Sequence, residues 1–134
     1  TAPLQREWLG DRDDAVRYWA AAGLHARPQL DAADRKALRA ALTDQSPVVR
    51  IEAASALASH GEGTAALPVL TAALRDESPE VALHAARALE LLGPAAKSAQ
   101  PEMQARLATA REAEARGEVI AMFIRFSLEA ALAH

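Results

Sequence analysis

The strongest constraint on the fold of this chain is a motif that occurs twice. Residues 44–57 read DQSPVVRIEAASAL, and residues 76–89, thirty-two positions later, read DESPEVALHAARAL. A weaker copy lies near the N-terminus, because Asp11, Val16 and Leu24 align with the corresponding residues of both copies. Self-similarity at a spacing of roughly 20–50 residues is the sequence signature of a repeat protein.

Each copy predicts two helices. An N-cap residue opens the first helix of each copy: Asp13, Ser46 and Ser78. A Ser or Asp side chain at the N-cap accepts a backbone N–H that the first helical turn leaves unpaired. Proline follows both serines, and it suits the first turn because it has no N–H to lose. Gly61 and Gly93 are typical of helix ends, and we expect the second helices to begin near Pro68 and Pro101.

The copies predict an all-α fold. The chain is 51% hydrophobic and rich in Ala and Leu, which are strong helix formers. One helix pair cannot bury its apolar face alone, so neighbouring pairs must stack. The prediction is an α-α superhelix in a single domain, residues 1–134, with about three helix-pair repeats between two end helices. Its boundaries are residues 1–10 for an N-terminal half-repeat helix, 11–42, 43–75 and 76–110 for the repeats, and 117–134 for a C-terminal capping helix.

The N-terminal half-repeat leaves two interpretations open. Residues 2–11 align with residues 67–76, so the chain begins on the second helix of an incomplete unit. This helix is either a natural cap of the array or the result of a cut through a longer protein. The chain also starts at Thr rather than Met, which is typical of a processed or excised segment.

Composition disfavours several classes of function. The net charge of −3 provides no basic field to hold phosphates, so we expect no nucleic-acid partner. Cysteine is absent, which removes thiol catalysis and thiolate metal sites. No apolar run is long enough and free enough of charge to cross a bilayer, so we expect no membrane partner. The histidines lack ligand spacing, and we expect no metal, no cofactor and no catalytic residue; they are His25, His60, His84 and His134.

The motif D-x-x-x-x-V-R-x-x-A-A-x-x-L carries a family resemblance. It occurs at residues 11–24 and again at 44–57, and the third copy, 76–89, has Ala82 in place of the Arg. The chain therefore resembles the HEAT repeat class, in the short bacterial form also seen in phycobilin-lyase-like repeat proteins. The resemblance covers about residues 2–110. It implies an α-solenoid but no particular function.

Four stretches carry a narrower resemblance: AVRYWAAAGL (15–24), DQSPVVRIEAASAL (44–57), ALPVL (66–70) and VALHAARALELLGPAA (81–96). They look like the helical-repeat segment that follows the catalytic domain in some bacterial sulfatases. The resemblance implies a calcium-dependent, usually exported parent, hence a periplasmic or secreted location; without it we expect a cytoplasmic one. None of that chemistry lies in this chain, because the nucleophile motif, Cys or Ser followed by x-P-x-R, is absent.

Charged residues at the repeat junctions predict an inter-repeat ladder. Arg17 and Arg50 follow aligned valines, and each is expected to bridge to an aspartate at a junction, such as Asp44 or Asp76. The alternative is a ligand-binding role for the arginines. Ala82 interrupts the ladder in the third copy, which indicates that this copy has a different neighbour.

Aromatic residues, only 4% of the chain, are candidates for an interaction surface. Trp19 aligns with the polar residues Glu52 and His84, so it is predicted to lie outside the deep core. It is expected either to contact a partner or to pack locally against Trp8 or the incomplete first helix. Tyr18 aligns with apolar residues in the other copies and is a better candidate for the core.

The tail GEVIAMFIRFSLEAALAH, residues 117–134, departs from the repeat and carries two apolar stripes. The first stripe is Val119, Phe123, Phe126 and Ala130, and the second is Ile120, Ile124, Leu128 and Ala131. One stripe is predicted to cap the third repeat. The other is predicted to meet a second subunit or an adjacent domain.

The leading interpretation is a non-catalytic protein-interaction or domain-bracing module. Its contact candidates are Trp8, Trp19, His84, Phe123 and Phe126. The expected partner is a protein, either an adjacent domain of a parent chain or a second copy. The second interpretation is the C-terminal accessory region of a bacterial sulfatase whose catalytic domain is absent here. A third, nucleic-acid binding by an arginine-lined groove, is disfavoured by the acidic net charge.

Overall fold

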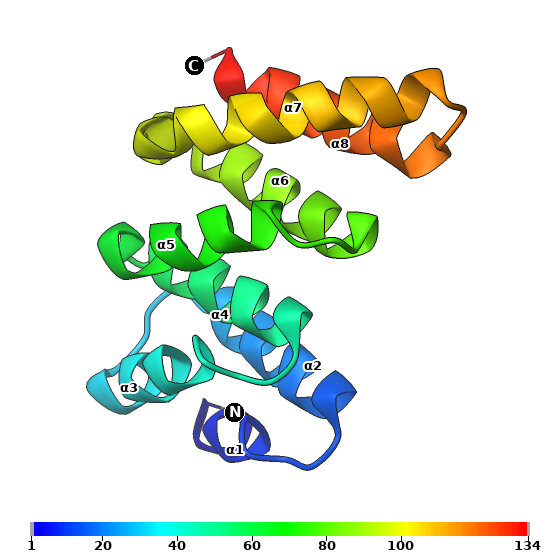
Figure 1. Cartoon of the computed structure of the whole chain (residues 1–134). Helices are drawn as coiled ribbons and strands as arrows, with labels where there is room; N and C mark the ends of the chain where they lie inside the picture. The colour runs from blue at the N-terminus through cyan, green and yellow to red at the C-terminus, as the bar shows by residue number, and fades with distance from the viewer. Residues whose placement is uncertain (1, 134) are drawn as a thin grey trace. The chain divides into compact units, whose positions relative to one another are not determined.

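A computed structural model describes residues 2–133, with the side chains of residues 5–133 (Figure 1). His134 lies outside the described residues. The helices are α1 (Ala2–Trp8), α2 (Asp14–His25), α3 (Ala32–Ala41), α4 (Pro47–Ser59), α5 (Gly63–Leu74), α6 (Pro79–Leu92), the 3₁₀ helix η1 (Gly93–Ala99), α7 (Gln100–Ala115) and α8 (Val119–Leu132). The predicted all-α, repeat-like fold is confirmed. The chain divides into two compact units, Thr1–Val69 and Leu70–His134, and the division falls inside α5.

Side-chain caps explain where several helices begin. Asp13 accepts a backbone N–H of the first turn of α2 at 2.9 Å, and Ser78 accepts one from α6 at 3.4 Å. Asp31 and Asp34 form a capping box at α3, in which each carboxylate accepts the backbone N–H of the other residue. These carboxylate and hydroxyl groups therefore satisfy donors that a helix N-terminus leaves unpaired.

Two local predictions are wrong. The Ser46 side chain makes no cap hydrogen bond at α4; instead, Asp44 Oδ1 accepts the N–H of Ser46 at 2.9 Å and orders the turn. Helix α5 begins at Gly63 rather than near Pro68. Proline has no N–H to donate to the helix ladder. Residues before it still gain from helix formation because Ala66 is fully buried.

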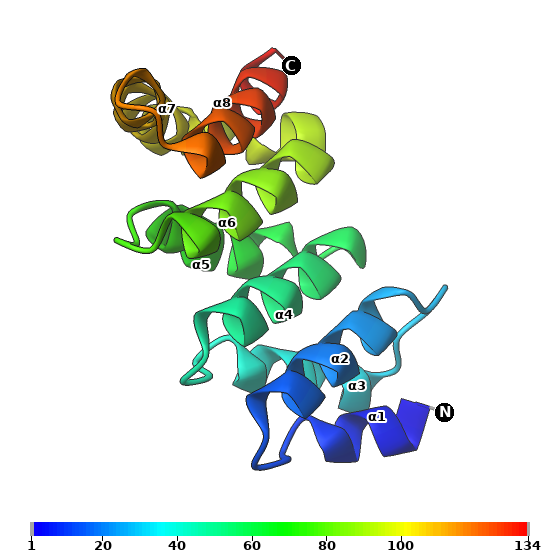
Figure 2. The same ribbon diagram turned by 90° about the vertical axis from the view of Figure 1, so that its right-hand side faces the viewer.

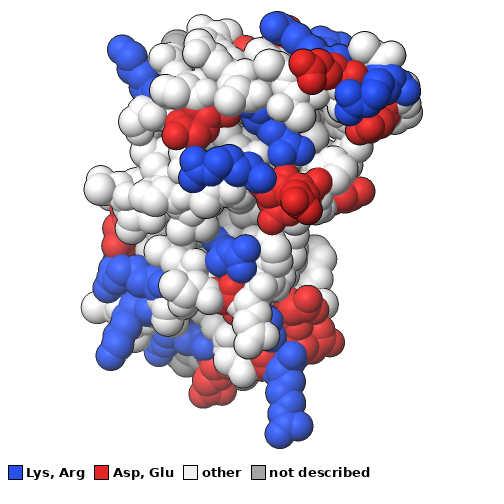
Figure 3. Space-filling model, in the orientation of Figure 1, with Lys and Arg blue, Asp and Glu red and all other residues white. Residues whose placement is uncertain are grey.

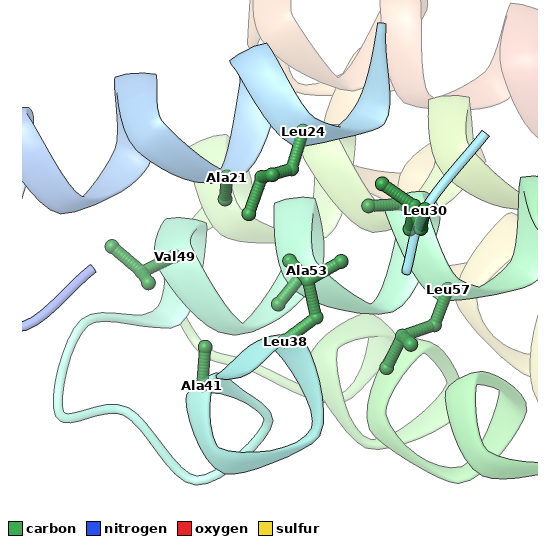
Figure 4. Close-up of a cluster of buried hydrophobic side chains, with 9 residues drawn as sticks. Ala21, Leu24, Leu30, Leu38, Ala41, Val49, Ala53 and Leu57 are labelled. Carbon is green, nitrogen blue, oxygen red and sulfur yellow. The ribbon is translucent and has the colours of Figure 1, made fainter. Parts of the chain in front are cut away.

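The first unit has its own hydrophobic core, where side chains of α2, α3 and α4 point toward one another (Figure 4). Helix α4 packs against α2 and α3, and α1 also packs against α2 and α3. The buried cluster consists of Ala21, Leu24, Leu30, Leu38, Ala41, Val49, Ala53, Ala56 and Leu57. Tyr18, the aromatic residue expected nearer to the core, is partly buried and packs on this cluster with Leu9 and Leu42.

In the second unit, α8 packs along both α6 and α7 (Figure 2). The buried residues of α8 include Ile124, Leu128 and Ala131, which belong to the second stripe of the tail. The first stripe is exposed at Val119, Phe123 and Phe126. The 3₁₀ helix η1, which the sequence did not predict, joins α6 to α7 and also contacts α8. One apolar side of α8 is therefore buried within the unit, and the other faces outward.

Candidate functional site

The residues predicted to form an interaction surface are distributed over both units. Trp8 and Trp19 lie in the first unit, whereas His84, Phe123 and Phe126 lie in the second. Trp8 is 45% exposed, Trp19 70%, Phe123 48% and Phe126 50%, and His84 is also exposed. Four large aromatic side chains thus offer apolar area to a partner.

Trp19 lies on the exposed side of α2. Its ring meets the ring of Tyr18 edge-on, with centroids 5.4 Å apart and an interplanar angle of 80°. Because Tyr18 packs on the buried cluster of the first unit, it holds the exposed indole against the helix surface. Trp19 therefore presents a large, pre-oriented apolar side chain.

The exposed face of α8 combines two aromatic rings with an arginine. The rings of Phe123 and Phe126 meet edge-on with centroids 6.4 Å apart, and the Arg125 guanidinium lies 4.6 Å from the centre of the Phe126 ring. Arg125 is held by Glu114 of α7 through two hydrogen bonds and by Glu129 at 2.7 Å. The hydrogen bonds from Arg125 lower the pKa of Glu114 despite some burial. This network fixes the guanidinium and, through it, the Phe126 ring.

Arg17 and Asp44, two of the predicted ladder residues, form a bidentate pair in the first unit. Arg17 Nε and Nη2 donate to the two carboxylate oxygens of Asp44 at 2.9 and 3.0 Å. Burial raises the pKa of Asp44, but the Arg17 and Ser46 hydrogen bonds and the charges of Arg17 and Arg50 outweigh it, so the pKa lies below its ordinary value. Arg17 Nη1 also donates to the carbonyls of Asp11 and Arg12.

Arg50 and Asp76 lie in different units. Arg50 Nη1 donates to the carbonyls of Asp44 and Gln45 at 2.6 and 3.3 Å. Asp76 Oδ1 accepts the N–H of Ser78 at 2.8 Å, so each aspartate orders the turn that precedes its own helix.

Arg106 makes one of the carbonyl contacts that Ala82 cannot make, the contact with Asp76, and sequence reasoning missed it. In the first two copies, Nη1 of Arg17 or Arg50 binds carbonyls at the start of its own copy. In the third copy, Arg106 reaches over from α7, and its Nη1 donates to the carbonyls of Leu74 and Asp76 at 3.0 and 2.8 Å. The sequence contains a partial signal: without an arginine at position 82, the Asp76 carbonyl needs another donor, but the aligned copies do not identify which residue supplies it.

A histidine–carboxylate pair also escaped the sequence analysis. Nδ1 of His25, at the end of α2, lies 2.8 Å from Oε1 of Glu52 on α4, with 30% and 18% of the two side chains exposed. His60 Nε2 lies 3.3 Å from the His25 carbonyl oxygen, and Arg35 donates to the His60 carbonyl at 2.9 Å. These contacts tie together the ends of helices in the first unit.

The His25–Glu52 pair predicts a pH dependence of stability. The hydrogen bond to Glu52 raises the pKa of His25, burial lowers it, and the Glu52 charge raises it, so that the pKa lies above 6.5. The stabilisation is therefore fully present below about pH 6.5 and is lost as the pH rises through the folded-state pKa. We expect the free energy of unfolding to fall by less than about 1 kcal/mol across this window. Urea unfolding at several pH values checks this.

The matched variant for this prediction is Glu52→Gln. It removes the charge partner but keeps a side chain of similar size, so the pH-dependent difference from the native chain isolates the pair. Identical pH dependence in the two proteins would contradict the assignment.

The described residues, 2–133, provide neither a metal-binding cluster nor a membrane-spanning helix. Within that range no group of three or more His, Asp or Glu side chains could hold a metal ion. No helix in the described part is both long and apolar enough to cross a membrane. Figure 3 shows Lys and Arg side chains interspersed with Asp and Glu on the face in view, so that face carries no field of a single sign.

Comparison with known proteins identifies one matching family. A family model of HEAT repeats matches residues 35–124, about two thirds of the chain. The matched region begins within α3 and ends within α8, so it contains the copies of the motif headed by Asp44 and Asp76. No curated protein matches the chain.

Proposed function

The chain belongs to the HEAT-repeat family, and from this premise we propose that it is a non-catalytic protein-interaction or domain-bracing module. HEAT repeats commonly mediate protein interactions. The observation that carries the proposal is the exposed face of α8, where Phe123 and Phe126 are each about half exposed and Arg125 is locked over the Phe126 ring. Phenylalanine and arginine are among the residue types enriched in the cores of protein interfaces.

Trp19 is the second contact that we propose. It is 70% exposed and its ring is held by Tyr18, so a partner gains a large apolar contact with little loss of side-chain freedom. Trp8 and His84 complete the proposed set. Trp8 and Trp19 lie in the first unit, whereas His84, Phe123 and Phe126 lie in the second.

The test is the association of the full chain after single substitutions. Phe126→Ser and Trp19→Ala are each expected to weaken self-association, or binding to a partner recovered from the native host, by about tenfold or more. Sedimentation velocity measures the first and a quantitative pull-down the second. Circular dichroism establishes that each variant is still folded.

Leu91→Ser is the matched control, because Leu91 is 80% exposed on α6 and belongs to neither proposed contact. It is expected to leave association unchanged. If Phe126→Ser and Trp19→Ala also leave it unchanged while remaining folded, neither side chain is a contact and the proposal loses its basis.

The accessory-domain interpretation stays a prediction. Its support is the four stretches that look like the helical segment of bacterial sulfatases, and the family match adds nothing to it because that match concerns HEAT repeats alone. It requires a reading frame that continues upstream into a catalytic domain bearing Cys or Ser followed by x-P-x-R. An upstream stop codon directly before Thr1 would contradict it.

A further inference from the structure

A groove lies in the second unit, between the end of α5 and one side of α7. It has a volume of about 430 Å³ and is lined by Leu74, Arg75, Pro101, Glu102, Ala105, Arg106 and Thr109. Leu74, Pro101 and Ala105 make part of the lining apolar. Two guanidinium groups and one carboxylate give the lining a net positive charge. The groove lies apart from the aromatic face of α8 described above.

One N–H donor of Arg106, beside this groove, has no hydrogen-bond partner among the described residues. Arg106 Nη1 is committed to the carbonyls of Leu74 and Asp76. Its Nε is buried and has no hydrogen-bond partner among the described residues. A buried donor without an acceptor is costly, so it is a place where an incoming acceptor gains more than it would at the exposed surface.

The contacts of Arg17 in the first unit indicate which kind of group Arg106 Nε can bind. Arg17 also commits Nη1 to two backbone carbonyls, those of Asp11 and Arg12. The remaining edge of its guanidinium, Nε and Nη2, takes both oxygens of a carboxylate, that of Asp44. Arg106 likewise binds two backbone carbonyls through Nη1, but no carboxylate binds its Nε. The unpaired edge of the Arg106 guanidinium therefore matches the hydrogen-bonding pattern of a carboxylate.

Arg75 adds a second cation at the edge of the groove. Its side chain is 65% exposed, and its Nη1 lies 4.0 Å from Glu102 Oε1, beyond hydrogen-bonding distance. Arg75 and Glu102 are 27 residues apart in the sequence. Two other pairs with this separation are within hydrogen-bonding distance: Arg17–Asp44 at 2.9 Å and His25–Glu52 at 2.8 Å. Arg75 thus has donors available for a ligand.

We propose that this groove binds a carboxylate side chain from an acidic segment of a partner protein, with Arg75 as the exposed donor and Arg106 Nε as a donor that a small shift of the Arg106 side chain opens to the ligand. A net charge of about +1 suits a monoanionic carboxylate better than a phosphate dianion, which Glu102 would repel. The apolar part of the lining suits the methylene groups and the neighbouring apolar residue of a peptide. The inference rests on the proposed role in protein interaction, and it adds the chemistry of one partner segment.

The experiment follows the arginine Nε–H signals of the ¹⁵N-labelled full chain by nuclear magnetic resonance. The probes are the blocked tripeptide acetyl-Leu-Glu-Leu-amide, its Gln counterpart and inorganic phosphate. The Glu peptide is expected to shift the Arg106 signal saturably and to bind about tenfold or more tightly than the Gln peptide, because only a carboxylate accepts charge-assisted bonds at both oxygens.

Substitutions outside the carbonyl contacts keep the test independent of folding. Arg75→Gln is expected to weaken binding of the Glu peptide by about two- to fivefold, and Glu102→Gln to strengthen it by a similar factor. Arg111→Gln, an exposed arginine of α7 that does not line the groove, is the control and is expected to change nothing.

Three results would each overturn the proposal: no shift of the Arg106 signal, equal binding of the Glu and Gln peptides, or phosphate binding tighter than that of the Glu peptide. A negative result here leaves the association test with Phe126→Ser untouched, so this inference and the proposed function can fail separately.

Discussion

Leu89→Ala is expected to lower the free energy of unfolding by about 2–5 kcal/mol. Leu89 is fully buried on α6, and it aligns with Leu24 and Leu57, which are also fully buried. Truncation removes the transfer free energy of the lost methyl and methylene groups and leaves a cavity that close-packed neighbours fill only in part. Urea unfolding followed by far-ultraviolet circular dichroism measures the loss.

Leu91→Ala is the control for this prediction in the same helix. Leu91 lies two residues further on but is 80% exposed, so its truncation is expected to change the free energy of unfolding by no more than about 0.5 kcal/mol. Both changes replace Leu by the best helix former, so helix propensity does not separate them. Equal losses from the two variants would show that the repeat alignment does not identify the buried side of α6.

The buried positions were predictable because the copies repeat them. Leu24, Leu57 and Leu89 coincide in the alignment, and all three are inaccessible to solvent. The exposed position of Trp19 was predictable for the complementary reason, since its counterparts Glu52 and His84 are polar. Comparison of the copies therefore shows whether a set of equivalent positions is buried or exposed. The predicted repeat boundaries and contact residues stay predictions.

Side-chain pairs between helices were harder to predict, because they depend on the sequence separation of two residues that meet in the fold. The structure has a regular answer: Arg17–Asp44, His25–Glu52 and Arg35–Glu62 are each separated by 27 residues. Arg75 and Glu102 have the same separation. Arg17–Asp44 was predicted because both residues lie at a repeat junction. The other pairs were not, because this spacing is shorter than the repeat period and an alignment of equivalent positions does not bring the partners together.

The groove around Arg106 was unpredictable for a different reason. It depends on a departure from the repeat, Ala82, and on an arginine from α7 that reaches the carbonyls left behind. The aligned copies contain no equivalent of that contact. Sequence repetition therefore predicts the framework, whereas the candidate site arises where one copy differs from the others.

Asp34→Asn is expected to lower the free energy of unfolding by about 2–3 kcal/mol. Asp34 is 1% exposed, and both of its oxygens accept: Oδ1 from Arg6 Nη1 at 2.8 Å and Oδ2 from the N–H of Asp31 at 3.1 Å. An amide offers one oxygen, so its NH₂ group must face one of these donors. The change also removes the buried charge that holds Arg6, and with it α1, against the start of α3.

Asp31→Asn is the matched control, because it alters the other carboxylate of the same capping box. The Asp31 side chain is 62% exposed, and its Oδ1 accepts from both the N–H of Asp34 and Arg6 Nη1, so an amide oxygen can keep these two bonds. The second bond from Arg6 Nη1, to Oδ2 at 3.1 Å, is lost, but it lies at the surface. Asn caps a helix about as well as Asp. We therefore expect a clearly smaller loss of stability than for Asp34→Asn. If urea unfolding gave equal losses for the two variants, burial of Asp34 would not be what makes its carboxylate important, and the attachment of α1 would need another cause.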